Sequence, residues 1–206
     1  LHAYKYHVFW DFREVTPSKI KPYDELFEML NGGGVPSIGE AVLELTLQTV
    51  HAAFRDMIDP EHLKKSKNGW YQKSVKKAAL APFKSKIKLF IRSVKELETG
   101  HKIPEVSVLK SAEADFVAIM NLVYKLAAKS KAADSWADDV KALLPDTDSG
   151  DLCGWKVMLG WATLRHLNEI CTLHEEQAFN LIRDWHLEKF LRQSLIHVSA
   201  DNYDTE

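Results

Sequence analysis

Apolar residues recur at helical spacing along most of the chain. From residue 43 to residue 57 they come at steps of four and three, which places them on one side of a helix. The same period returns at 83–97 and at 106–129. Residues 152–171 are apolar on nearly all sides, which is typical of a helix surrounded by others. These patterns predict an all-α fold.

Capping residues and helix breakers set the expected limits of the helices. Ser37-Ile38-Gly39-Glu40 has the form of a capping box, in which the Ser and Glu side chains satisfy amides of the first turn. Asp59 before Pro60 indicates a cap followed by a first-turn proline. Asn68-Gly69 predicts a turn, and Pro82 divides the helical stretch after it. The expected helices include 23–30, 71–81, 83–98, 106–129, 136–144 and 152–171, with a last helix opened by a second capping box at Thr172.

A different period marks the N-terminus. Residues 4–12 carry aromatic or branched side chains at alternate positions, which is typical of a strand or an extended aromatic arm. Because no second segment offers a strand partner, we expect an arm. The 206 residues fit a single helical domain, a bundle of seven or eight helices. Its expected parts are the arm and linker (1–35), the helical core (36–198) and an acidic tail (199–206).

Composition and cysteine spacing exclude several classes of protein. With 46% hydrophobic and 27% charged residues the chain is of globular type, and no apolar run is long enough for a transmembrane segment. Cys153 and Cys171 would lie roughly 27 Å apart on one continuous helix, so they are expected to stay unpaired. Free cysteines favour a reducing, cytoplasmic compartment. The chain begins with Leu1 and shows no signal-peptide pattern, from which we expect a processed or excised piece of a longer protein.

Candidate catalytic chemistry is sparse. The chain has nine His but no Glu-x-x-His, and His166 and Glu169 stand in the reverse order on one helical face. His51 and Arg55 lie four apart on another helix. These four residues are the candidate polar cluster of an enzyme, although local polar contacts explain each pair equally well. We expect no metal and no cofactor, and whether the chain is an enzyme stays open.

The charge distribution is the strongest signal. Residues 62–95 carry eleven basic side chains and no acidic one, so this basic segment has a charge of +11. The rest of the chain has 16 Lys and Arg against 29 Asp and Glu, a charge of −13, and the total of −2 hides the difference. Trp70 and Tyr71 lie inside the segment. Its basic residues are Lys64, Lys65, Lys67, Lys73, Lys76, Lys77, Lys84, Lys86, Lys88, Arg92 and Lys95.

Three interpretations of the basic segment remain open. It forms a solvated face that acidic neighbours of the same fold complement, or it docks on an acidic domain or protein partner. The third, nucleic acid or an anionic membrane surface, draws support from the aromatic pair Trp70 and Tyr71. Only one of the eleven residues is Arg, the side chain that recognises bases and phosphates with two hydrogen bonds, so nucleic acid is not favoured.

Some segments resemble a known family. Asp11–Glu14, Gly33–Val42 and Val50–Arg55 are similar to the helical region that follows the catalytic barrel in some bacterial α-amylase-superfamily proteins, and Arg183–Leu191 resembles its closing helix. The resemblance covers about a third of the chain and includes no catalytic motif. It implies a non-catalytic accessory domain of a glycoside hydrolase-like protein, packed against other domains of the parent polypeptide. The alternative is a free-standing helical binding protein whose basic segment engages an acidic protein, nucleic acid or an anionic surface.

Overall fold

The computed structural model describes residues 13–18, 20–70, 74–97, 105–129, 152–171, 173 and 175–200. Within these residues every regular element is a helix, apart from an isolated bridge between Ser18 and Lys21. The prediction of an all-α fold is therefore confirmed. The expected arm at 4–12 and the expected helix at 136–144 lie outside the described residues.

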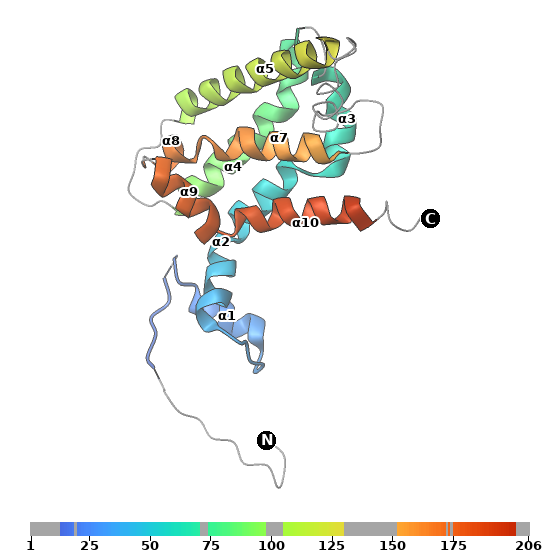
Figure 1. Cartoon of the computed structure of the whole chain (residues 1–206). Coiled ribbons are helices and arrows are strands. Elements are labelled where there is room, and N and C mark those ends of the chain that lie inside the picture. The colour runs from blue at the N-terminus through green and yellow to red at the C-terminus, as the bar shows by residue number, and fades with distance from the viewer. Residues whose placement is uncertain are drawn as a thin grey trace. The chain divides into compact units, whose positions relative to one another are not determined.

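The helices follow one another with short connections (Figure 1). No helix among the described residues is both long and apolar enough to cross a membrane. The elements are α1 (Tyr23–Leu30), α2 (Ile38–Met57), α3 (Pro60–Trp70), the 3₁₀ helix η1 (Lys77–Leu80), α4 (Ala81–Leu97), α5 (Glu105–Lys129), α7 (Cys153–Leu164), α8 (Leu167–Cys171), α9 (Glu175–Asp184) and α10 (Leu187–Ala200).

Contacts group the chain into two compact units, residues 1–48 and 49–206, which divide within α2. In the first unit α1 has the predicted bounds and buries Leu26. The Thr46 hydroxyl lies 3.0 Å from the carbonyl oxygen of Ile20, which holds the segment before α1 beside α2. Ser37 caps α2 as predicted, because its hydroxyl accepts a hydrogen bond of 3.3 Å from the amide of Glu40.

The second unit contains the main hydrophobic core. In Figure 1, α7 runs through its middle, with α5 on one side and α10 on the other. The core side chains come from α2, α3, α4, α5, α7 and α8. At Gly160 an added Cβ would lie 2.6 Å from Leu191 Cδ2, so glycine permits the close approach of α7 and α10. The largest buried side chains of this unit are Trp70, Trp155, Phe54, Phe83, Phe90 and Phe116.

The predicted turn at Asn68-Gly69 is wrong, because α3 continues through both residues to Trp70. A Cβ at Gly69 would lie 3.3 Å from the Cβ of Ala79, so this glycine serves a close contact with η1 rather than a turn. The helix expected at 71–81 is also wrong for residues 74–76, which are not helical. Asp59 is the predicted cap, and its carboxylate accepts a 2.9 Å hydrogen bond from the amide of His62.

The C-terminal part breaks where the periodicity predicted continuous helices. The expected helix 152–171 is interrupted at Arg165-His166, between α7 and α8. The last helix is interrupted at Trp185-His186, where His186 has a left-handed φ of 54°. This second break frees the Trp185 carbonyl from the helical ladder, and His51 Nε2 donates a 2.8 Å hydrogen bond to it. A tertiary contact therefore rewards the break, and α10 then packs along α7.

Candidate functional site: the basic segment of α3, η1 and α4

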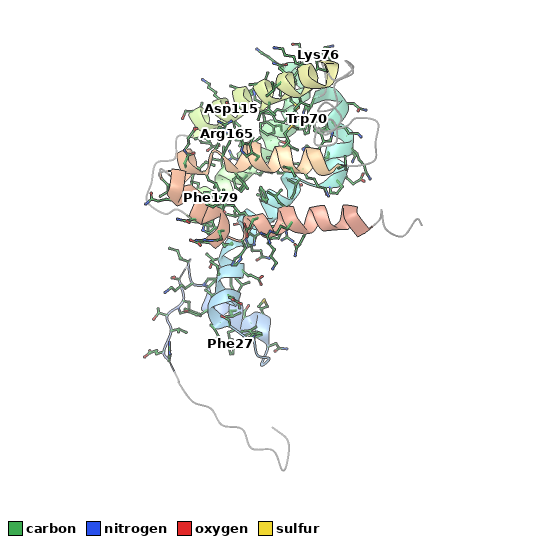
Figure 2. The ribbon with its side chains drawn as sticks, viewed as in Figure 1. Phe27, Trp70, Lys76, Asp115, Arg165 and Phe179 are labelled. Atoms are coloured by element: carbon green, nitrogen blue, oxygen red, sulfur yellow. The ribbon has the colours of Figure 1, made fainter. Side chains whose placement is uncertain are left out.

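The basic segment forms one continuous part of the second unit. It begins in α3, passes through η1 and fills most of α4, and Figure 2 shows Lys76 and Trp70 in this region. On α4, Lys84, Lys88, Arg92 and Lys95 follow at steps of four, four and three, so they lie along one side of the helix. The core residues of α4, among them Phe83, occupy the opposite side.

Four of the eleven cations are paired with carboxylates of the same chain. Lys84 Nζ lies 2.6 Å from Glu113 Oε2 and Arg92 Nε lies 3.5 Å from Glu105 Oε1, both on α5. The order of the partners is reversed, which gives a ladder between two antiparallel helices. On the other flank of α4, Lys86 pairs with Asp56 of α2. These three pairs fix α4 against its neighbours.

The fourth pair, Lys64 with Glu61, is of a different kind. It joins two exposed side chains three residues apart on α3, with a distance of 3.2 Å between Nζ and Oε1. Pairs of this type contribute about 0.2–0.5 kcal/mol to helix stability. Lys64 therefore gains little from its partner, and its ammonium group remains accessible to solvent.

Five exposed lysines form no ion pair within the described part of the chain. They are spread over all three elements of the segment and outnumber the four paired cations. Lys67 is half-buried, and Lys73 lies outside the described residues. The internal complement thus accounts for only part of the positive charge. We call these five residues the free lysines: Lys65, Lys76, Lys77, Lys88 and Lys95.

Trp70 belongs to the core and not to the surface. It is fully buried, with its ring 5.2 Å from that of Phe116 and 6.0 Å from that of Trp155. Its indole Nε1 donates a 2.7 Å hydrogen bond to the carbonyl oxygen of Ala79, which joins α3 to η1. A ring in this position has no face on which a nucleotide base stacks. Tyr71, the other member of the aromatic pair, lies outside the described residues.

His62 is half-buried at the start of the segment, where its ring contacts Trp70 edge to face at 5.5 Å. Burial, together with the nearby Lys86 charge, lowers the pKa of His62 below its ordinary value of 6.5, against the opposing effect of Asp56 and Asp59. The folded protein therefore binds a proton at His62 less readily than the unfolded chain does.

This pKa shift predicts a loss of stability in acid. The stability contributed by neutral His62 is fully present above the unfolded pKa of about 6.5 and is lost as the pH falls toward the lower, folded pKa. We expect the free energy of unfolding in urea to decrease between pH 7.5 and pH 5, and to decrease less in His62→Gln. The exposed His186 provides the control. An equal decrease in His62→Gln and the parent would contradict this assignment.

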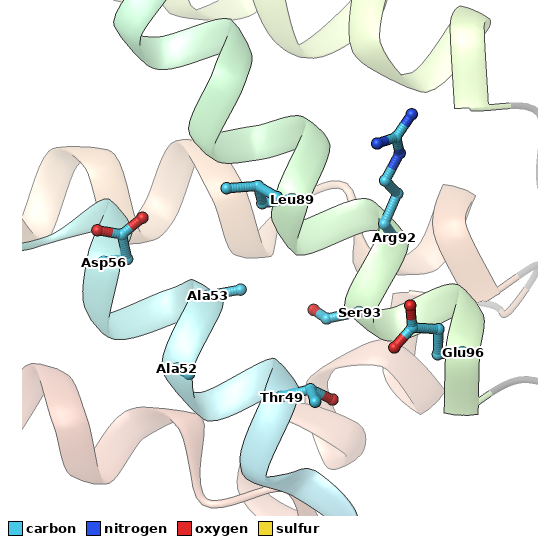
Figure 3. Close-up of a pocket in the computed structure, with 8 residues that line it drawn as sticks. All are labelled: Thr49, Ala52, Ala53, Asp56, Leu89, Arg92, Ser93 and Glu96. Atoms are coloured by element: carbon cyan, nitrogen blue, oxygen red, sulfur yellow. The ribbon is translucent and has the colours of Figure 1, made fainter.

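A shallow groove runs between α2 and α4 beside the basic stripe (Figure 3). Its volume is about 530 Å³. Ala52 and Ala53 of α2 face Leu89 of α4 across it, and Leu89 is half exposed. The buried Ser93 hydroxyl lies at its base and donates to the Phe90 carbonyl oxygen. The lining residues are Thr49, Ala52, Ala53, Asp56, Leu89, Arg92, Ser93 and Glu96.

The two pairs of the candidate polar cluster have separate sets of partners. His51 is buried and packs edge to face on Phe190 with ring centroids 4.7 Å apart, while the Arg55 guanidinium lies 5.1 Å from the centre of the same ring. The Trp185 carbonyl accepts from His51, as described above. These contacts are those of a histidine and an arginine that anchor α10 to α2.

His166 and Glu169 belong to a second polar cluster, between α5 and the α7–α8 turn. The buried His166 ring has Nδ1 3.3 Å from Glu169 Oε1 and Nε2 3.4 Å from Asp115 Oδ2. Arg165 Nη2 lies 3.4 Å from the same Asp115 oxygen, and Figure 2 shows both residues. No group of three or more His, Cys, Asp or Glu in the described residues is arranged to hold a metal ion. The cluster reads as a structural clamp on the turn.

Comparisons with protein-family models, with characterised proteins and with solved structures find no match to this chain. The functional argument therefore rests on the geometry of the basic segment.

Proposed function

We propose that this chain is a helical binding protein whose basic segment docks on the acidic surface of a protein partner. The observation that carries the proposal is the set of five free lysines, which keep their charge exposed while Lys84, Lys86 and Arg92 are used in internal packing. A surface of this kind attracts an opposite charge, steers the encounter and fixes the register of docking.

Two features favour an acidic protein over nucleic acid. The free lysines include no arginine, and the single arginine of the segment is paired with Glu105. The buried ring of Trp70 removes one of the two aromatic residues that suggested base stacking. Exposed carboxylates such as Glu61 and Glu96 also stand among the lysines. Such an alternation suits the mixed charges of a protein surface better than a continuous line of phosphates.

The accessory-domain hypothesis stays a prediction from the resemblance to the α-amylase superfamily. If a glycosidase-like barrel belongs to the same polypeptide, the acidic partner is another domain of that polypeptide and the free lysines make the contact. The reading frame upstream of Leu1 tests this version, because it either encodes such a barrel or does not. Cytoplasmic location likewise stays a prediction.

Binding to a simple acidic polypeptide tests the proposed function. At low ionic strength we expect the chain, despite its net charge of −2, to bind poly-L-glutamate with an affinity that falls steeply as NaCl is raised. Isothermal titration against poly-L-glutamate and duplex DNA, at matched charge concentration and salt, provides the measurement. Failure to bind poly-L-glutamate would contradict the proposal, and tighter binding of DNA would assign the surface to nucleic acid.

A further inference from the structure

The α2–α4 groove and the free lysines of α4 form one continuous docking surface. Leu89 lines the groove, and the side of α4 that carries Lys88 and Lys95 is next to it around the helix. The groove presents small apolar side chains, while its outer rim presents ammonium groups. The distance from Leu89 to Glu96 along α4 is about 10 Å, the length of two helical turns. The surface therefore suits a short helix that is both apolar and acidic.

The first unit of this chain carries such a helix. Residues 22–48 contain five acidic residues and no Lys or Arg. Within them α1 has eight residues, a length of about 12 Å, and bears Asp24, Glu25 and Glu28. Leu26 is buried inside the first unit, whereas Phe27 is 77% exposed. Phe27 thus stands in solvent with Glu28 beside it and Asp24 one turn away.

We propose that α1 of one copy of this chain docks in the α2–α4 groove of a second copy. Phe27 is the anchor between Ala52, Ala53 and Leu89, and the carboxylates of α1 face Lys88 and Lys95. The inference rests on the proposed function and names the acidic partner of the same basic surface. Charge complementarity carries it, because each copy contains both an acidic apolar helix and a basic apolar groove. A contact between two different surfaces is heterologous and builds a ring or a chain of copies.

Charge reversal on the two sides provides the test. Sedimentation equilibrium of the intact parent chain at low salt is expected to show association that weakens as NaCl is raised. Asp24→Lys/Glu28→Lys and Lys88→Glu/Lys95→Glu are each expected to be monomeric. An equimolar mixture of the two variants is expected to associate again, because both pairs of surfaces become complementary. A fold defect cannot produce this rescue, and far-UV circular dichroism checks each variant.

The apolar anchor has a matched control. Phe27→Ser is expected to weaken self-association about tenfold or more, since a buried aromatic anchor dominates such an interface. Phe179→Ser removes a ring of α9 that is also exposed, at 71%, and is expected to leave association unchanged. A monomeric parent, a mixture that stays monomeric, or equal effects of the two substitutions would overturn the inference. If the monomeric parent still binds poly-L-glutamate, the proposed function stands and only the second copy is excluded as the partner.

Discussion

Replacement of Trp70 by Ala is expected to lower the free energy of unfolding by about 3–5 kcal/mol, the usual cost of deleting a fully buried aromatic ring. Trp70 packs between Phe116 and Trp155 and holds Ala79 through its indole Nε1. Its loss opens a cavity and leaves the Ala79 carbonyl without its donor. Because domains of this kind are stable by only about 5–15 kcal/mol, the change removes a large part of the total. Urea unfolding followed by circular dichroism measures it.

Trp161→Ala is the matched control, because it makes the same substitution at a tryptophan of α7 that is 51% exposed. Its ring is covered on one face by the Arg165 guanidinium, 4.6 Å from the ring centre. We expect a cost of about 1 kcal/mol or less, the scale of an exposed cation–π contact. Equal losses at the two positions would contradict the placement of Trp70 in the core. They would also remove the reason given above against base stacking.

The second large effect is expected from the free lysines. When all five are replaced by Gln, the basic segment keeps only its paired or half-buried cations and Lys73, so poly-L-glutamate binding at low salt should fall at least tenfold. The expected change in stability is small, because none of the five makes an ion pair in the described residues. Single removal of Lys84 or Lys86 has the opposite profile, a loss of packing between helices with little loss of binding.

Local signals in the sequence predicted many of the helices well. The bounds of α1, the cap at Ser37 and the cap at Asp59 all depend on residues within one turn of each other, and the structure confirms them. The breaks at His166 and His186 depend on distant partners. His166 is clamped by Asp115 of α5, and the carbonyl freed before His186 is used by His51 of α2. Periodicity carries no information about such contacts.

The candidate site was predictable to a similar degree. The excess of positive charge at 62–95 is a property of composition, and the step of four along α4 gives the stripe. Which lysines are free could not be predicted, because Lys84 and Arg92 find their partners on α5, across an interhelical packing. The burial of Trp70 depends on Phe116 and Trp155 in the same way. The groove requires the placement of α2 beside α4.

The most direct test of the central claim compares two variants of equal net charge. In one, the free lysines Lys65, Lys76, Lys77, Lys88 and Lys95 are replaced by Gln. In the control, five exposed cations outside the basic segment are replaced: Lys21, Lys110, Lys125, Lys189 and Arg192. Titration with poly-L-glutamate at low salt is predicted to show at least tenfold weaker binding for the first variant and near-parental binding for the control. Equal affinities of the two variants would contradict the account, since they would make binding a matter of total charge and not of this surface.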